Sequence, residues 1–458
     1  MDIMTTITSA ELTKTTAFLR DHEIAHVKVG VFDGDGILRG KYLSREKFLH
    51  ALEHGMGFCD VVLGWDSNDQ LFDNVKFTGW HTAYPDAMVR ILPSTQRIIP
   101  YEPKTALFLA EFSGAAEAVC PRATLRRVLM RAHELGFAVS AAAEFEFFMF
   151  DETPDSIRAK GYQQLKTMTP GYFGYSVLRS SVQAELYQDL LDLSQTMGFP
   201  IEGLHTETGP GVVEAALSYC EALEAADRAA LFKTFVKVFA QRRGLMATFM
   251  AKWSQSLPGQ SGHLHVSMKR LDGGSVFYDA KKPNQMSDEM RWFIGGQQAL
   301  MPEVLAMVAS TVNSYSRLVP GFWAPTSATW GIENRTTALR VIRGGASSQR
   351  VEYRIAAADI NPYLALAAAI GSGLWGIEQR IEPDNPIVGN AYDQVHPAIR
   401  KLPSTLWDAA ERLAHSNAAR SLFGDAFVDH HAATRQWEER EFRRSVTDWE
   451  LSRYFEII

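Results

Sequence analysis

Alternation of apolar and polar residues divides the first part of the chain into short elements. Residues 26–43, HVKVGVFDGDGILRGKYL, alternate with period two on either side of a turn rich in Gly and Asp, which predicts a β-hairpin. Helices are predicted at 9–22, capped by Ser9, and at 45–54. Strands are predicted in the runs CDVVLGW, AMVRILP and TALFLAEF, so residues 1–115 are expected to form a small α+β domain.

After the linker SGAAEAVCP, longer helices and strands alternate, and residues 116–458 are expected to form a second, larger domain. Helical spacing of apolar residues occurs in PRATLRRVLMRAHELG, near 180–197 and near 219–243, and NPYLALAAAIGSGLWGI is a predicted helix of small residues suited to close packing. FAVSAAAEFEFFMF is predicted to be a strand. A simple Rossmann sheet is disfavoured because no GxGxxG follows a strand, and the strands disfavour a pure helix bundle.

The composition is that of a globular protein with a large core: 458 residues, of which 46% are hydrophobic and 22% charged. A formal charge of −7 and the lack of a Lys- and Arg-rich run disfavour nucleic-acid binding. The three cysteines, Cys59, Cys120 and Cys220, are widely spaced, which is typical of a reducing compartment. No signal peptide or membrane-spanning segment is predicted, so we expect a soluble cytoplasmic protein that binds small molecules.

The strand AAAEFEFFMF carries two carboxylates in an otherwise apolar run. Because side chains alternate across a strand, Glu144 and Glu146 share one face and lie about 7 Å apart along it. Like charges on a partly buried face need a cation or a bound proton. From this strand alone, two interpretations are open: a solvated strand edge, or a metal or acid–base site.

Polar residues occupy one face of further apolar segments. HLHVSM and RVEYRI alternate with period two, and the Gly-Pro-Gly turn of HTETGPGVVEAAL can bring distant carboxylates together. The polar members are His263, His265, Ser267, Arg350, Glu352, Arg354, Glu207 and Glu214. Each segment alone is weak evidence, but with the first strand they offer five carboxylates and a histidine, a set that suits Mg²⁺ or Mn²⁺ and a bound phosphate.

Arginines are concentrated in the same part of the chain, in SRLVPG, ENRTTALR and QRVEYR. Such a density is expected where anionic groups are held bidentately. Apolar residues alternate with these arginines, which disfavours a merely solvated basic surface. The arginines are Arg317, Arg335, Arg340, Arg350 and Arg354.

These segments together resemble the signatures of the glutamine synthetase family. EFEFF, ETGPGVVE, HLHVS, NSYSRLVPG, NRTTALR, RVEYR and NPYLALAA occur in the family's order and approximate spacing, and the similarity runs nearly end to end. It implies an α+β fold with a β-grasp-like N-terminal domain and a catalytic domain whose curved antiparallel sheet is flanked by helices. It also implies a homo-oligomer, commonly a dodecamer of two stacked hexameric rings, with each site lying between neighbouring subunits.

The resemblance implies a role for each matching residue. The metal positions are Glu146, Glu207 and Glu214 for one ion and Glu144, His263 and Glu352 for a second, with two or three Mg²⁺ or Mn²⁺ ions per site. L-Glutamate is expected at Arg317, Arg354 and His263. ATP is expected at His265, Ser267, Arg335, Arg340 and Arg350. Asp66 and Tyr172 match walls of an ammonium pocket, and Asp66, Arg317 and Arg335 match catalytic positions.

The implied reaction has two steps: the glutamate γ-carboxylate attacks the γ-phosphate of ATP, and a nitrogen nucleophile displaces phosphate from γ-glutamyl phosphate. One position departs from the family, because RLVPGFWAP has Trp323 where ammonia-using members have a glutamate that helps deprotonate ammonium. An indole cannot accept a proton, but it offers apolar surface and a π face that attracts cations. We therefore expect a small primary amine as substrate, with Asp66 attracting its ammonium group and Trp323, with Phe322 or Trp65, contacting its alkyl part.

Three other functions are weighed against this one. An ammonia-using glutamine synthetase requires that the exchange at Trp323 has no consequence. A kinase of guanidino compounds, which resembles the same catalytic fold, is disfavoured by six matching metal-ligand positions, and a non-catalytic relative is disfavoured because all six are retained. Within the family the resemblance is closest to γ-glutamylamide synthetases of amine catabolism, such as those for isopropylamine, ethanolamine or putrescine. A single apolar wall favours a short alkylamine over a diamine.

Overall fold

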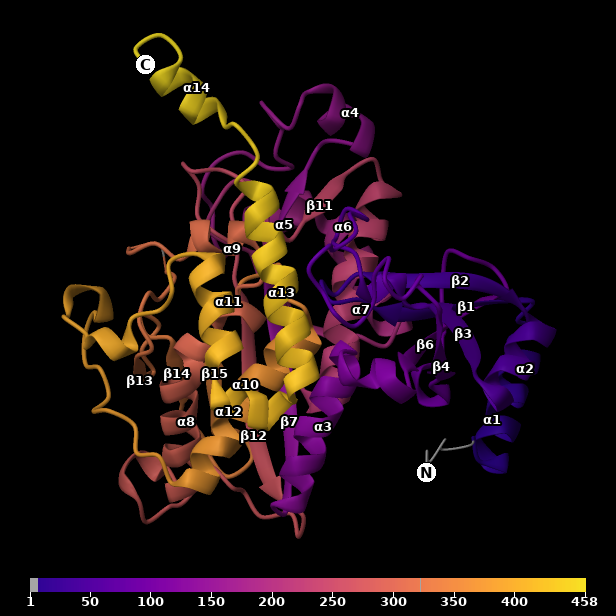
Figure 1. The fold of residues 1–458 in the computed structure, drawn as a ribbon, viewed down its shortest axis with the longest axis horizontal. Coiled ribbons are helices and arrows are strands. Elements are labelled where there is room, and N and C mark those ends of the chain that lie inside the picture. The colour runs from indigo at the N-terminus through magenta and orange to yellow at the C-terminus, as the bar shows by residue number, and fades with distance from the viewer. Residues whose placement is uncertain (1–6, 322) are drawn as a thin grey trace.

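The computed structural model describes residues 7–321 and 323–458, and within them the chain forms two β-sheets (Figure 1). The strands of the N-terminal sheet are β1 (His26–Phe32), β2 (Leu38–Ser44), β3 (Met56–Cys59), β4 (Asp86–Ile91), β5 (Arg97–Ile98) and β6 (Thr105–Phe112). Their order is β2-β1-β6-β4-β3, with β5 beside β6. β1 and β2 form the predicted hairpin, in which Phe32 pairs with Leu38 across the turn.

Two predicted helices, α1 (Ser9–Asp21) and α2 (Arg45–His54), pack their apolar residues against this sheet. The cap of α1 differs from the prediction, because Thr8 rather than Ser9 precedes the first turn. The Thr8 hydroxyl accepts a hydrogen bond from the Glu11 N–H, and the Glu11 carboxylate accepts one from the Thr8 N–H. This reciprocal pair satisfies two N–H groups that a helix start otherwise leaves without partners.

The run CDVVLGW was expected to be a strand, and this expectation is wrong. β3 ends at Cys59, and a 3₁₀ turn covers Asp60–Leu63. The chain turns at Asp60, whose buried carboxylate accepts a hydrogen bond of 2.6 Å from the Thr78 hydroxyl. Apolar content alone did not distinguish a strand from a buried turn. The β-grasp-like assignment of the N-terminal part and a domain limit at residue 115 stay predictions.

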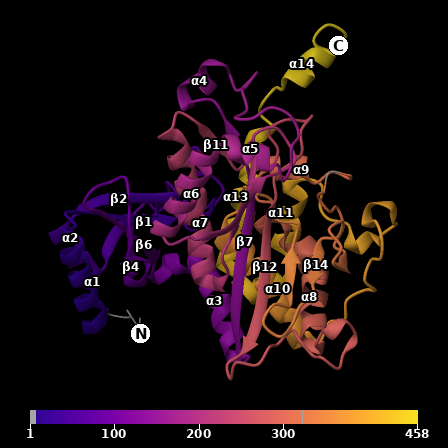
Figure 2. The ribbon, with the colours of Figure 1, turned by 180° about the vertical axis from the view of Figure 1, so that it is seen from behind.

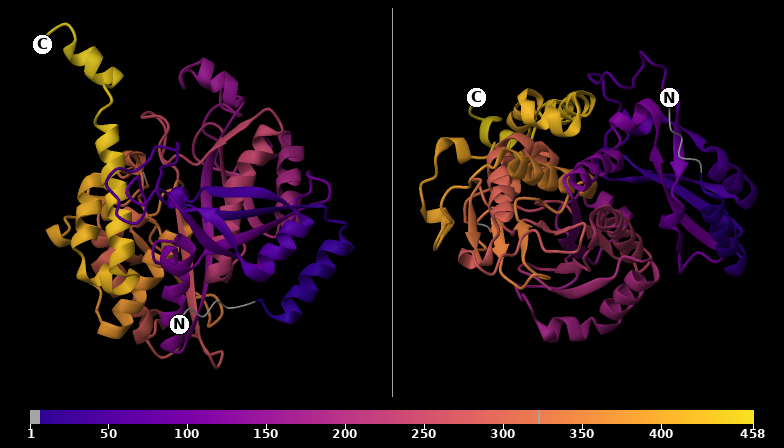
Figure 3. Two further views of the ribbon diagram at one scale, coloured as in Figure 1. Left: turned by 45° about the vertical axis from the view of Figure 1, so that its right-hand side comes forward. Right: turned by 90° about the horizontal axis from the view of Figure 1, so that it is seen from below.

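The second sheet curls around the centre of the molecule (Figure 3). Its order is β13-β14-β15-β12-β7-β9-β8, and β10 and β11 pair with the two ends of β7. All neighbours are antiparallel except β13 and β14, so the predicted antiparallel sheet has one parallel edge pair. Its strands are β7 (Phe137–Phe150), β8 (Ile201–Thr206), β9 (Val212–Leu217), β10 (Cys220–Glu221), β11 (Met246–Thr248), β12 (Gly262–Arg270), β13 (Trp330–Ile332), β14 (Leu339–Ile342) and β15 (Arg350–Tyr353).

Long helices cover the outer face of this sheet (Figure 2). Phe145 and Phe147 of β7 point away from the carboxylate face and pack on Phe232 of α7. α8 and α10 cross closely, because an added Cβ on Gly296 would lie 2.5 Å from the Gly376 Cα. The helices are α3 (Pro121–Glu134), α4 (Pro154–Ala159), α5 (Val177–Val182), α6 (Ala184–Thr196), α7 (Ala222–Gln241), α8 (Asp288–Val304), α9 (Val312–Arg317), α10 (Pro362–Gln379), α11 (Leu406–His415), α12 (Asn417–Phe423), α13 (Asp425–Phe442) and α14 (Asp448–Tyr454).

The C-terminal segment leaves the body of the molecule. After α13, the short helix α14 projects away from both sheets (Figure 1). Its apolar side chains are exposed, among them Trp449, Leu451 and Phe455. Among the described helices, none combines the length and apolarity needed to cross a membrane.

Candidate active site

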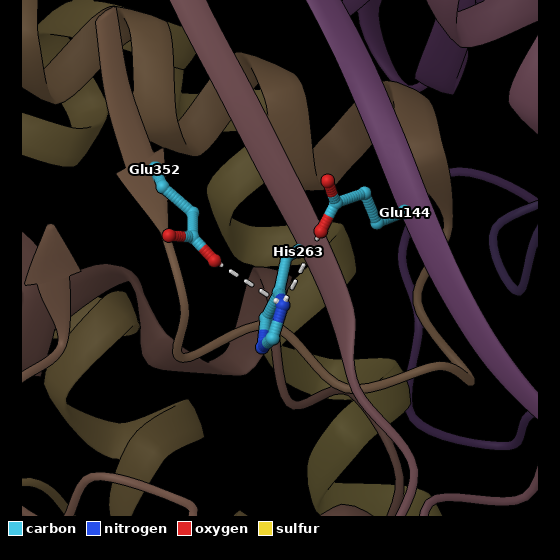
Figure 4. A group of neighbouring side chains, drawn as sticks. All are labelled: Glu144, His263 and Glu352. Carbon is cyan, nitrogen blue, oxygen red and sulfur yellow. Dashed lines mark ion pairs between the residues drawn. The ribbon is translucent and has the colours of Figure 1, made fainter. Parts of the chain in front are cut away.

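One group of metal-ligating side chains lies on three neighbouring strands. Glu144 comes from β7, His263 from β12 and Glu352 from β15, and Glu144 and His263 are direct partners in the ladder (Figure 4). The His263 Nδ1 lies 3.4 Å from a Glu352 oxygen and 3.8 Å from a Glu144 oxygen. One ligand atom from each residue falls within 4.8 Å of the others. The spacing allows these three atoms to contact a single cation.

A second group comes from β8, β9 and the loop between them, and contains His205, Glu207 and Glu214. Glu214 is the ladder partner of both His205 and Glu146. The predicted ligand Glu146 lies outside this group of ligand atoms, and its Oε2 accepts a hydrogen bond of 2.6 Å from the Ser261 N–H. His205 was missed from the sequence. Its position two residues before Glu207, on the same face of HTETG, was the available signal.

The electrostatics of the two groups fit a divalent cation. Burial raises the pKa of Glu214 to about 9, and the charges of Glu146 and Glu144 add to this shift. Burial and Glu146 also raise the pKa of Glu207. Within the described residues, buried Glu207 Oε2, His205 Nε2 and His263 Nε2 have no hydrogen-bond partner. Oxygen and imidazole ligands with excess negative charge are those that Mg²⁺ and Mn²⁺ prefer.

Glu144 and Glu352 stay ionised despite burial. Burial opposes ionisation of Glu144, but the neighbouring imidazoles of His263 and His265, at 3.8 and 3.1 Å, outweigh it and hold its pKa well below the usual range. For Glu352, burial is outweighed by the charges of His263 and Arg354, so its pKa is also lowered. Two ionised carboxylates, Glu144 and Glu352, therefore lie beside the His263 imidazole and can bind a cation with it.

Arginines line the same cavity, whose volume is about 610 Å³. Arg340 Nη1 donates to a Glu352 oxygen at 3.0 Å, and Arg354 Nη1 donates to the other oxygen. Arg350 Nε donates to the His265 Nδ1 at 3.3 Å. Arg340 Nε and Arg354 Nε have no hydrogen-bond partner within the described residues. The cavity lining that was predicted from the sequence is Glu144, Glu146, Glu207, Glu214, His263, His265, Trp323, Arg335, Arg340, Arg350, Glu352 and Arg354.

Ser267 and Arg317 lie beside this cavity. Ser267 lines an adjoining cavity of about 240 Å³, which shares Glu144, His265 and Arg350 with the first. Arg317 is 2% exposed and is not part of the lining. It donates to the Ile355 and Arg354 carbonyls and to the Ser261 hydroxyl, and burial lowers its pKa to about 10. Arg317 thus supports the wall formed by the Ser261 segment.

Asp66 and Tyr172 are not among the residues that line the cavity of their own chain. Asp66 lines a separate cavity with residues of α9 and α13. Tyr172 is 53% exposed, whereas Tyr175 lines the first cavity and stacks on His205 at a centroid distance of 4.3 Å. Trp323 lines that cavity too, is 60% exposed and has a left-handed φ of 59°.

The two aromatic residues suggested as companions of Trp323 have different outcomes. Phe322 lies outside the described residues. Trp65 lies under Arg39, whose guanidinium carbon is 4.9 Å from the ring centroid, and is not among the residues lining the cavity of Trp323. Within the described part of the chain, Trp65 is therefore not brought to the cavity of Trp323.

A curled sheet that presents two ligand groups and several arginines to one cavity is typical of metal-dependent phosphoryl-transfer enzymes. The chain belongs to the glutamine synthetase family, because residues 118–454 match the glutamine synthetase catalytic domain. A type-1 glutamine synthetase 2 from Dictyostelium discoideum is 47% identical over 438 residues, covering 94% of this chain and 84% of its own. A glutamate–isopropylamine ligase from a Pseudomonas species is 36% identical over 454 residues, covering 98% of each chain.

Further relatives agree with this assignment. A γ-glutamylethanolamide synthetase from Streptomyces coelicolor is 36% identical over 430 residues, covering 93% of this chain and 91% of its own. The solved structure of a GmaS/ADP complex superposes with a TM-score of 0.84 at 25% identity, over 96% of this chain and 99% of that one. The chain is therefore similar to enzymes named for glutamine synthesis and to enzymes named for joining glutamate to an amine.

Proposed function

We propose that this enzyme joins the γ-carboxylate of L-glutamate to a small primary amine, using ATP and forming a γ-glutamylamide, ADP and phosphate. The observation that carries the proposal is Trp323, an aromatic residue in the lining of the cavity that also holds both ligand groups. Two relatives support it: one is named as a ligase of glutamate and isopropylamine, and the other as a synthetase of γ-glutamylethanolamide. A short alkylamine is favoured over a diamine, whose second charge would require its own carboxylate.

The residues divide the work between metal, phosphate and glutamate. His205, Glu207 and Glu214 are proposed to hold one ion, and Glu144, His263 and Glu352 to hold another. Glu146, outside the first of these groups, is proposed to contribute to the same ion from the neighbouring strand, where it is the ladder partner of Glu214. Bound Mg²⁺ or Mn²⁺ neutralises these carboxylates and withdraws charge from phosphate oxygens. Phosphate contacts are assigned to Arg335 and Arg340, nucleotide contacts to His265, Ser267 and Arg350, and glutamate contacts to Arg354 and His263. Arg317, expected from the sequence to bind glutamate, is proposed to act from behind the cavity wall through its hydrogen bonds to the Ser261 hydroxyl and the Arg354 carbonyl.

Two bonds form in sequence. A γ-carboxylate oxygen of glutamate attacks the γ-phosphorus of ATP, the bond to the bridging oxygen breaks, and ADP leaves. The bound ammonium group then loses a proton, the amine nitrogen attacks the γ-carbonyl carbon, phosphate leaves, and the nitrogen loses a second proton. Arg335 and Arg340 stabilise charge on the transferring group, as preorganised donors do in such reactions. Trp323 contacts the alkyl part of the amine, and we assign the reaction to amine catabolism.

Asp66 and Tyr172 are proposed to reach the active site of a neighbouring subunit. Asp66 opens to a different cavity from the ligand groups of its own chain, which supports a site completed by another copy. The projecting α14, with exposed Trp449 and Phe455, supports self-association because such apolar surface is costly in water. We propose a homo-oligomer, a dodecamer of two hexameric rings, with its catalytic sites between subunits.

An ammonia-using glutamine synthetase is the second candidate, and the Dictyostelium relative named for that activity favours it. A guanidino kinase and a non-catalytic relative are both disfavoured by the intact ligand groups. Product analysis tests the proposal: the enzyme with ATP, Mg²⁺, glutamate and ethylamine should yield γ-glutamylethylamide by mass spectrometry. Glutamine formed from ammonia, with no amide formed from any of a panel of alkylamines, would overturn it.

A further inference from the structure

The loop that carries Asp66 is a tight, internally bonded turn. Asp66 Oδ1 accepts hydrogen bonds of 2.8 Å from the N–H groups of Asn68 and Gln70. The Asp66 N–H donates to the Gln70 carbonyl at 2.9 Å, and Asp69 has a left-handed φ of 60°. Within the described residues, Asp66 Oδ2 accepts no side-chain or backbone hydrogen bond, and Asp66 lines a cavity. One carboxylate oxygen is held by the turn and the other is left for a ligand.

Arg39 of β2 holds this turn from outside. Its Nη1 donates to Asp69 Oδ1 at 2.7 Å and its Nη2 to the Asp66 carbonyl at 3.3 Å. The same guanidinium lies over the Trp65 ring. A planar guanidinium with several fixed donors can donate hydrogen bonds to two residues of a short turn at once, whereas a Lys ammonium acts as a single point charge.

The Nε of the same Arg39 guanidinium binds the hairpin turn between β1 and β2, and this turn is held by two helices. Arg39 Nε donates to Asp33 Oδ2 at 2.8 Å, and Asp33, in the hairpin turn, is 1% exposed. The backbone of this turn is fixed in its place, because the Asn361 side chain at the start of α10 donates to the Asp33 carbonyl at 3.0 Å. Arg435 of α13 donates to Asp35 Oδ1 at 2.7 Å. Arg39 therefore ties the Asp66 turn to helices of the larger sheet.

We propose that Arg39 is a positioning residue that sets the direction of the Asp66 carboxylate and so controls the affinity for the amine. This inference rests on the proposed function, in which Asp66 attracts the ammonium group. Arg39 is not among the described residues that line the cavity of the ligand groups or the adjoining cavity of Ser267. Loss of the guanidinium should increase the conformational freedom of the turn, so that the Asp66 carboxylate adopts the orientation that binds the amine less often.

Steady-state kinetics of Arg39→Gln, Asp66→Asn and the double variant test the inference. In Arg39→Gln we expect the amine KM to rise about tenfold while the KM values for glutamate and ATP change less than about twofold. In the Asp66→Asn background, Arg39→Gln should change the amine KM less than about twofold, because Arg39 acts through Asp66. Arg20→Gln is the matched control, since it removes an exposed ion pair of α1 and should leave all KM values as in the wild type.

An unchanged amine KM in Arg39→Gln would overturn the inference, as would equal increases in all KM values or additive effects in the double variant. Failure of the proposed function gives a different result, because the wild-type enzyme would then form no amide from any alkylamine tested and would have no amine KM for the variants to change. If Arg39→Gln does not fold, Asp69→Asn removes the negative charge at the loop end of the contact and so weakens it, and Asn tolerates a left-handed backbone. A wild-type amine KM in Asp69→Asn would likewise overturn the inference.

Discussion

Replacing Glu352 by Gln removes one buried charge and preserves the shape of the side chain. Glu352 is 1% exposed and faces His263, Arg340 and Arg354. The Arg340 and Arg354 side chains are 12% and 6% exposed, so the change leaves Arg354 without its carboxylate and Arg340 with Glu333 as its remaining carboxylate partner. Breaking one partner of a buried pair costs about 3–5 kcal/mol. We therefore expect a clearly lower unfolding temperature in metal-free buffer.

The same substitution should weaken metal binding. A lost interaction with a charged group is worth about 1.5–3 kcal/mol, which corresponds to a loss of roughly 10- to 150-fold in affinity. Free Mn²⁺ measured by electron paramagnetic resonance during titration gives the affinity directly. Glu333→Gln is the matched control: Glu333 also pairs with Arg340, at 2.8 Å, but is 38% exposed and outside both ligand groups. Wild-type Mn²⁺ affinity in Glu352→Gln would refute the assignment of this residue as a ligand.

Three further changes have defined outcomes. Trp323→Glu should raise kcat/KM for ammonia relative to alkylamines, since it restores a proton acceptor and removes apolar surface; an unchanged ratio would remove Trp323 from the explanation. Arg317→Lys should raise the glutamate KM about tenfold with the ATP KM unchanged, because Lys cannot replace the three donors that support the cavity wall; equal effects on both substrates would contradict this. Burial lowers the pKa of His430 to about 4 and of His431 to about 3 from 6.5, so the unfolded chain takes up protons first as the pH falls. The stability present at pH 7 should therefore decline below pH 6.5, by about 3 kcal/mol at pH 4 for His430 alone; equal denaturant stability at pH 7 and pH 4.5 in metal-free buffer would contradict this.

Local patterns predicted the elements of the fold well. Period-two alternation correctly separated the faces of β7, with Phe145, Phe147 and Met149 in the main core. Phe148, on the carboxylate side, belongs to a separate small cluster with Phe150 and Val212. The prediction of an element failed where a tertiary contact determines the backbone conformation. At Asp60 the carboxylate accepts a hydrogen bond from the Thr78 hydroxyl, and the chain forms a 3₁₀ turn in place of the predicted strand.

The candidate site was predicted less evenly than the fold. Alternation placed Glu144 and His263 on polar strand faces, but only the ladder between β7 and β12 makes them neighbours. His205 was overlooked because a single strand histidine carries little information until its partner strand, with Glu214, is known. Asp66 shows the same limit: its local sequence gives a turn, whereas its distance from the ligand groups depends on how the two sheets are arranged.

The ratio of kcat/KM for a short alkylamine to that for ammonia tests the central claim most directly. The assay measures phosphate release with saturating ATP and glutamate, Mg²⁺, and each nitrogen substrate varied separately. An enzyme whose cavity lining includes Trp323, which offers apolar surface and cannot accept a proton, should use isopropylamine or ethylamine more efficiently than ammonia. Clearly greater efficiency with ammonia than with every amine tested would contradict the proposal and identify the enzyme as a glutamine synthetase in activity as well as in family.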